Sequence, residues 1–270
     1  MAPKLRPDAI GVDEMKCFLE TESDFDFELR VLHKLRELNL DCEHGGHYED
    51  PVTKKSREFD IRMRVRGEGN LHLLAAIECK NLRQNFPLLI SCVPRTRDEA
   101  WHEMVRSDYG SSVVSAGQRV TSDSGLYRLG DWVGKSTIKV GVTPQGEMIT
   151  NDGEVYEKWG QCLSSLHCFV QEIPTLSANG GATMALPILV VPDGRLWQVR
   201  YNTDGSRVAD PEQVDRCAVY AGGFSIPFGR FETRIGISHV EVITFGGLMR
   251  FCRQRLGDER TMRALIFGHP

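Results

Sequence analysis

The strongest constraint on the fold of this chain is a pair of adjacent segments that have the pattern of two antiparallel β-strands. In residues 56–66, apolar side chains occupy every second position and mostly charged side chains lie between them. Strict alternation of this kind predicts a strand with one buried face. Residues 67–70 (GEGN) predict a tight turn, and residues 71–80 (LHLLAAIECK) are apolar enough for a central strand. The sequence therefore predicts a hairpin whose second strand lies inside a sheet.

Further periodic patterns predict the elements along the rest of the chain. Helices are predicted over residues 25–40, 96–109, 153–173 and 244–256, strands over residues 86–93, 131–142, 186–191 and 238–244, and a loop over residues 110–128. A turn at Asp193 and Gly194 predicts that residues 186–191 form a hairpin with residues 195–202. This order predicts an α/β (α+β) protein with a central mixed β-sheet flanked by helices.

Length and composition are those of an ordinary globular protein. The 270 residues are 41% hydrophobic and 26% charged, which excludes a wholly disordered or fibrous chain. The formal net charge of -4 excludes a uniformly basic nucleic-acid coat, but it is compatible with a local basic patch. The 8 cysteines lack metal-site spacing and predict reduced thiols. The N-terminal residues lack the apolar core of a signal peptide, and no apolar run is long enough for a membrane span. These features predict a cytoplasmic protein that does not cross a membrane.

Side chains suited to phosphodiester chemistry lie on the predicted hairpin. Glu78 and Lys80 are two residues apart on one strand and therefore share a face. Pairing across the turn can bring Asp60 close to Glu78, where two carboxylates repel unless a cation lies between them. Carboxylate oxygens suit Mg²⁺, and Lys80 could orient an attacking water. The competing interpretation is a set of solvated charges at the end of a strand.

A third carboxylate lies on the first long predicted helix. Glu28 precedes Val31, Leu32 and Leu35 by three, four and seven residues, which places it beside the apolar stripe that faces the core. It is a candidate third acid of the same site. The alternative is an ordinary glutamate on the flank of a helix.

Three segments in this order resemble the PD-(D/E)xK nuclease superfamily, which has the restriction-endonuclease-like fold. They are FELRVLHKLREL, EDPVTKKSREFDIRMRV and LLAAIECKNL, within residues 27–82. The resemblance implies that Asp60 is the first strand acid, that Glu78 and Lys80 are the E-x-K pair, and that Glu28 is the helix acid. No proline precedes Asp60, a departure that is frequent in the family. The implied core has the element order α-β-β-β-α-β.

The resemblance also implies a division of the chain. Residues 1–23 would be an N-terminal lead-in, and residues 24–192 would form the nuclease-like core, with residues 94–150 as an insertion. The helix over residues 153–173 and the strand over residues 186–191 would supply the last two core elements. Residues 193–270 would be a C-terminal extension of the same domain.

The activity implied by the resemblance is hydrolysis of DNA phosphodiester bonds, in restriction, defence or repair, by an endonuclease that uses Mg²⁺ or Mn²⁺. Asp60, Glu78 and Glu28 would hold the metal. A homodimer is a further expectation, because two cuts on antiparallel strands suit a two-fold axis. Two alternatives remain open: a nuclease that cleaves RNA, and a non-catalytic nucleic-acid-binding or structural subunit of the same fold.

Basic and polar residues near the expected site are candidates for contacts with nucleic acid. They are Lys54, Lys55, Arg57, Arg62, Arg64 and Arg66 around the first strand, and Lys158 and Gln161 on the second long helix. The competing interpretation of the first six is a solvated strand edge. On a helical projection, Lys158 and Gln161 are expected to lie off the apolar stripe.

Overall fold

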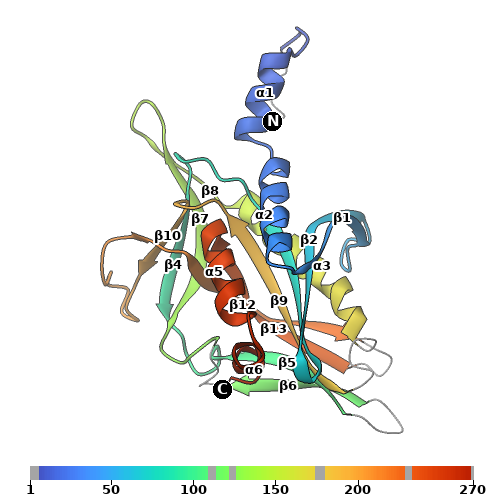
Figure 1. Ribbon diagram of the computed structural model, residues 1–270. Coiled ribbons are helices and arrows are strands. Elements are labelled where there is room, and N and C mark those ends of the chain that lie inside the picture. The colour runs from blue at the N-terminus through green and yellow to red at the C-terminus, as the bar shows by residue number, and fades with distance from the viewer. Residues whose placement is uncertain (1–5, 109–113, 122–125, 174–179, 229–232, 269–270) are drawn as a thin grey trace.

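The computed structural model contains one large mixed β-sheet with helices on both faces (Figure 1). It describes residues 6–108, 114–121, 126–173, 180–228 and 233–268. The helices are α1 (Val12–Thr21), α2 (Phe25–Glu37), α3 (Gly153–Phe169), α5 (Phe245–Arg255) and α6 (Glu259–Phe267), with short 3-10 turns η1 (Glu68–Asn70) and η2 (Val170–Glu172). None of the helices in these ranges is both long and apolar enough to cross a bilayer.

Thirteen strands of the described residues belong to this sheet. They are β1 (Asp41–Glu49), β2 (Ser56–Gly67), β3 (Leu71–Cys79), β4 (Leu88–Pro94), β5 (Trp101–Asp108), β6 (Val114–Thr121), β7 (Trp132–Val142), β8 (Met148–Asn151), β9 (Gly181–Val191), β10 (Leu196–Arg200), β11 (Glu212–Gln213), β12 (Arg216–Phe228) and β13 (Thr233–Thr244). Their order is β1-β2-β3-β9-β13-β12-β7-β4-β10-β11, with β5, β6 and β8 attached beside this path. Antiparallel pairs such as β2–β3 and parallel pairs such as β3–β9 occur together, which confirms the predicted mixed sheet.

The hairpin of β2 and β3 forms as predicted. The register runs from Gly67 opposite Leu71 to Ile61 opposite Ile77. All nine residues of β3 are buried, because β2 and β9 cover its two edges and helices cover its two faces. Burial of an apolar strand on both faces is the reason that its sequence is continuous rather than alternating.

Two layers of helices cover the two faces of the sheet around β3. On one face, Phe27 of α2 and Leu248 of α5 share a core cluster with Leu73. On the other face, Leu166 and Phe169 of α3 pack in a cluster with Leu74. Adjacent residues of β3 therefore point into different cores. Helix α1 contributes no buried residue and projects away from the sheet (Figure 1).

Two predicted elements between residues 96 and 128 are wrong. The segment predicted as a helix over residues 96–109 contains strand β5, and the segment predicted as a loop over residues 110–128 contains strand β6. Strand β5 pairs with β9, where Met104 lies opposite Met184. Since this partner lies far along the chain, its pairing overrides the local helix propensity of the segment.

The predicted hairpin between residues 186–191 and residues 195–202 does not form. Strand β10 pairs with β4 and β11 instead of β9. The reason is that both edges of β9 already have partners, with β3 on one edge and β13 and β5 on the other. A strand has only two edges for hydrogen bonding, so β10 has no place beside β9.

Strand β1 was not predicted, and it changes which strands neighbour the hairpin. It pairs with β2 at the edge of the sheet, and of its residues only Cys42 and Tyr48 are buried. The predicted strand at residues 86–93 does form, as β4, but it pairs with β7 and β10 and not with β3. Strand β13, in the predicted C-terminal extension, lies between β9 and β12 inside the sheet.

Candidate active site

The β2–β3 hairpin ends where Asp60 leaves the regular ladder. The pairing stops at Ile61 and Ile77, and the Asp60 side chain accepts a hydrogen bond from the backbone N–H of Cys79 at 2.7 Å. A carboxylate thus replaces the backbone acceptor that a continued ladder would supply. This bond holds Asp60 beside the end of β3.

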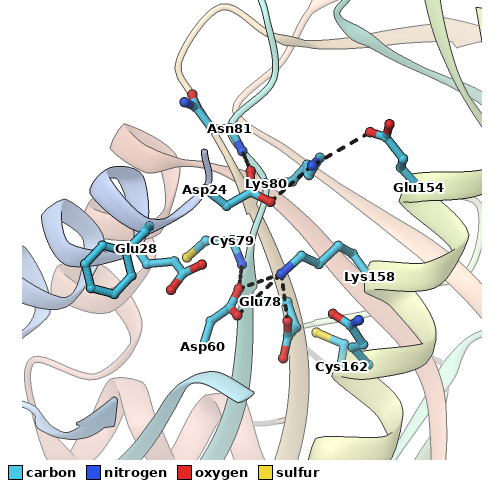
Figure 2. Close-up of polar contacts among 12 residues, drawn as sticks. Asp24, Glu28, Asp60, Glu78, Cys79, Lys80, Asn81, Glu154, Lys158 and Cys162 are labelled. Carbon is cyan, nitrogen blue, oxygen red and sulfur yellow. Dashed lines mark hydrogen bonds and ion pairs between the residues drawn. The ribbon is translucent and has the colours of Figure 1, made fainter. Parts of the chain in front are cut away.

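Glu78 lies next to Asp60 on the face of β3 that α3 covers. A single ammonium group, Nζ of Lys158 on α3, lies 3.0 Å from Oδ2 of Asp60 and 3.2 Å from Oε2 of Glu78 (Figure 2). Glu78 is 1% exposed. The structure therefore brings two of the predicted acids around one cation, which is the side chain of a lysine.

The electrostatics of this cluster favour either a proton on Glu78 or a second positive charge beside it. Burial, and then the neighbouring Asp60 carboxylate, raise the pKa of Glu78 well above its usual range. Although burial opposes its charge, the same two carboxylates raise the pKa of Lys158 and keep it protonated. Oε1 of Glu78 is buried and has no hydrogen-bond partner among the described residues. Such an oxygen is costly unless a donor or a cation reaches it.

Glu28 approaches the cluster from α2 on the opposite side. Its carboxylate points toward Asp60 and Cys79 (Figure 2), and its Oε2 lies 3.6 Å from Nε2 of His44. Burial, and then the charge of Asp60, raise the pKa of Glu28 to about 7. The charge of Glu28 is thus coupled to that of Asp60.

Lys80 does not join the two acids, which differs from the prediction. It follows the last residue of β3, and its Nζ lies 3.0 Å from Oδ2 of Asp24 and 3.7 Å from Glu154 (Figure 2). The backbone N–H of Asn81 donates to the other oxygen of Asp24 at 2.7 Å. Asp24, at the start of α2, therefore holds the segment after β3 and turns Lys80 away from Glu78.

Lys158 lies on the inner face of α3, contrary to the prediction that it lies off the buried stripe. Cys162, four residues later, is buried, and its thiol contacts the carbonyl oxygens of Ala76 and Ile188 in the sheet. Residues four apart share a helix face, so Lys158 points at the sheet as well. The spacing from Cys162 could have identified this orientation in the sequence.

Apart from Lys158, the basic and polar residues expected to contact nucleic acid fall into three groups. Arg64 pairs with Glu172 and Glu43, and the guanidinium of Arg62 stacks over the ring of Phe59. Both face α3 and help to attach it to the sheet.

The second group, Lys54, Lys55, Arg57 and Arg66, is exposed on or beside β2. The third is Gln161, whose backbone carbonyl accepts from the Tyr48 hydroxyl. Within the described part of the chain, none of these side chains forms a hydrogen bond or ion pair with Asp60 or Glu78.

A polar pocket adjoins the cluster on the side of Lys80. Its volume is about 240 Å³, and its walls include Lys80, Asn81, Arg83, Phe86 and Lys139. Lys139 is mostly buried, and its Nζ lies 2.6 Å from Oε2 of Glu154. The pocket thus has several cationic and amide hydrogen-bond donors on its walls. Two of them, Lys80 and Lys139, are paired with the acidic side chains of Asp24 and Glu154.

The residues fit a divalent ion with few protein ligands better than one with many. No group of three or more His, Cys, Asp or Glu side chains in the described part of the chain has the geometry to hold a metal. Asp60 and Glu78 nevertheless contact one cationic group, and Oε1 of Glu78 has no hydrogen-bond partner among the described residues. Mg²⁺ accepts one or two carboxylates and takes water or phosphate oxygens for the remainder.

Replacing Glu28 with glutamine is expected to change the pH dependence of stability. The folded-state pKa of about 7 lies above the ordinary value of 4.5, so wild-type stability falls as the pH rises between these values. The variant lacks this loss. We therefore expect the stability of the variant, measured relative to wild type, to be about 1 kcal/mol greater at pH 8 than at pH 4, after discounting for partial solvent exposure. Urea unfolding at several pH values measures this gain.

The exposed Asp26→Asn variant on the same helix is the control for the Glu28 experiment. A stability difference between Glu28→Gln and wild type that stays constant from pH 4 to pH 8 would contradict the coupling of Glu28 to Asp60.

Comparisons of this chain with protein-family models, with curated proteins and with solved structures found no match.

Proposed function

We propose that this protein is a metal-dependent nuclease that hydrolyses phosphodiester bonds, with DNA as the expected substrate. The observation that carries the proposal is the meeting of Asp60 and Glu78 around a single cationic group at the end of β3. Two acids from separate strands, buried together, are costly in a purely structural role. They are useful where a divalent ion must be held next to a phosphate.

The order of elements around the site supports the same proposal. Helix α2 is followed by the antiparallel strands β1, β2 and β3, then, after the intervening strands, by α3 and by β9 parallel to β3. This is the α-β-β-β-α-β order that the resemblance to PD-(D/E)xK nucleases implies. The first strand of that order is β1, and residues 80–152 would be the insertion.

Within this proposal, Asp60 and Glu78 would hold the metal, and Glu28 would add a third carboxylate beside them. The ion, when bound, would act as a Lewis acid that polarises the phosphate and lowers the pKa of a water molecule. Asp60 is oriented by the N–H of Cys79. Glu78 is oriented by its position on a strand that is buried on both faces.

Two lysines are candidates for positioning the attacking water. Lys80 is the lysine of the sequence motif, and it can act at the acids only when its ion pair with Asp24 opens. Lys158 is the lysine that contacts both acids. Its ammonium lies against both carboxylates, so it would have to move for a metal ion to contact the same two oxygens.

The test is cleavage of a panel of single- and double-stranded DNA and RNA with Mg²⁺ or Mn²⁺. We expect cleavage that EDTA abolishes, and we expect Lys80→Ala to reduce the rate at least about a hundredfold, the upper range for loss of one acid–base or charge-stabilising group. Lys34→Ala, an exposed lysine paired with Glu37 on α2, is the control. An intact panel with freshly prepared protein would refute the catalytic proposal.

A second function is favoured by one observation. Because Lys158 already pairs with both acids, the same cluster can serve a non-catalytic subunit that binds nucleic acid. Calorimetric titration with Mn²⁺ discriminates the two functions. Saturable metal binding that Glu78→Gln abolishes supports the nuclease, whereas nucleic-acid binding without any metal binding supports the non-catalytic subunit.

A further inference from the structure

A second cluster of buried polar residues lies several strands away from Asp60 in the sheet, among β4, β7, β12 and β13. Its centre is Arg95, which follows β4 and is 3% exposed. The Nε–H of Arg95 donates to Nε2 of His239 at 3.3 Å, and the other guanidinium nitrogens donate to the carbonyls of Arg128 at 3.0 Å and Trp132 at 3.5 Å. All three partners are neutral acceptors.

The hydrogen bonds of His239 show that its ring carries no charge. Its Nε2 accepts from Arg95, and its Nδ1 lies 2.8 Å from Oγ of Ser238, which itself donates to the carbonyl of Trp101. The ring therefore donates from Nδ1 and accepts at Nε2, a tautomer assigned from the network. In agreement, burial and then the nearby arginines lower the pKa of His239 to about 2.

A buried carboxylate near this cluster forms its ion pair with another arginine, although its charge also attracts Arg95. Glu241 on β13 receives two hydrogen bonds from Arg216 on β12, at 2.5 Å and 2.8 Å. No carboxylate of the described residues forms an ion pair with Arg95. Among the described residues, this region thus holds the buried Arg95, the partly exposed Arg216 and one buried carboxylate, which leaves an excess of one positive charge.

An open pocket adjoins this charge. It has a volume of about 210 Å³, and Arg95, Trp132, Gln198 and Arg216 line it. A guanidinium has five N–H groups, and the bonds to His239, Arg128 and Trp132 leave donors of Arg95 available. The acid on this wall, Asp131, is exposed, so solvent screens its charge.

We propose that this pocket binds the phosphate group of a nucleotide, or free phosphate, between Arg95 and Arg216. Planar guanidinium groups match the geometry of phosphate oxygens, and an anion there would supply the missing counter-charge. Trp132 provides a flat aromatic wall and Gln198 an amide, the two features that recognise a nucleobase beside the phosphate. The proposal shares no residue with the site around Asp60 and does not depend on nuclease activity.

Calorimetric titrations in EDTA test the proposal without metal at the acidic site. The probes are inorganic phosphate, adenosine 5′-monophosphate and adenosine. We expect saturable binding of the first two and none of adenosine. Tighter binding of the nucleotide than of phosphate identifies a nucleotide ligand, and equal binding identifies free phosphate.

The variant Arg95→Met removes the unpaired charge and is expected to weaken phosphate or nucleotide binding at least about tenfold, the effect of losing a charge-assisted hydrogen bond. Arg97→Met, an exposed arginine two residues away, is the control and should bind as wild type does. If Arg95→Met does not fold, Arg95→Lys keeps the charge, loses the planar fork, and should show the same weakening. Absence of saturable binding by the wild-type protein, or unchanged affinity in the Arg95 variants, would overturn the proposal.

Discussion

Replacing Lys158 with methionine is expected to lower the free energy of unfolding by about 3–5 kcal/mol at neutral pH, the usual cost of removing one partner from a buried charge pair. The variant leaves Asp60 and Glu78 buried next to each other without the cation that both contact. Urea unfolding followed by circular dichroism measures this loss. Lys16→Met, an exposed lysine on α1, is the control and should remain within about 0.5 kcal/mol of wild type.

The same variant separates a metal site from a purely structural ion pair. If the acids are metal ligands, Mn²⁺ or Mg²⁺ should occupy the space left by Lys158 and restore much of the lost stability, by mass action on the folded state. Adding Glu78→Gln to Lys158→Met should restore part of the lost stability without metal, because the repulsion between two buried carboxylates is then removed. A Lys158→Met protein as stable as wild type would show that the two acids are not held together in the folded protein.

Replacing Asp60 with asparagine or Glu78 with glutamine is expected to reduce Mg²⁺-dependent cleavage at least about a thousandfold, which corresponds to roughly 4 kcal/mol of activation free energy. Each change removes one of the two carboxylates proposed to hold the metal and keeps the size of the side chain. In Asp60→Asn, the amide oxygen can still accept from the N–H of Cys79, so the fold should be retained. Initial rates on a fluorescent DNA substrate measure the loss.

Glu58→Gln is the matched control for these two variants. Glu58 lies two residues before Asp60 on the same strand, and its side chain is 71% exposed. It should cleave at the wild-type rate. Full activity in Glu78→Gln would exclude Glu78 as a metal ligand, and equal traces of activity in wild type and variant would indicate a contaminating nuclease.

Local patterns were sufficient to predict the hairpin that carries the acids. The alternation around Ile61 and Met63 set which face of β2 is buried, and the short turn at residues 67–70 set the register to β3. With these two determined, the proximity of Asp60 and Glu78 followed from strand geometry. Strand β1 escaped detection because an edge strand needs few apolar residues and has the glycines Gly45 and Gly46 in its middle.

The lysine that contacts the acids could not be assigned from the sequence motif. Glu78 and Lys80 are two residues apart, but β3 ends at Cys79, so the strand rule no longer governs where Lys80 points. The side chain of Lys80 instead points to Asp24, which accepts hydrogen bonds from both Lys80 and the backbone N–H of Asn81. Lys158 reaches the acids because α3 packs across β3.

The sequence by itself determined the β2–β3 hairpin and the proximity of two acids on it, since these depend on contacts between neighbours along the chain. The order of helical and strand patterns also predicted a mixed sheet, but not which distant strands pair in it. The tertiary structure alone decided that β5 is a strand and that β10 pairs with β4 instead of β9. It also decided that Lys158, and not Lys80, contacts Asp60 and Glu78. The physical reason is that strand edges and buried charges take their partners from whatever the fold brings near, and those partners lie far away in the sequence.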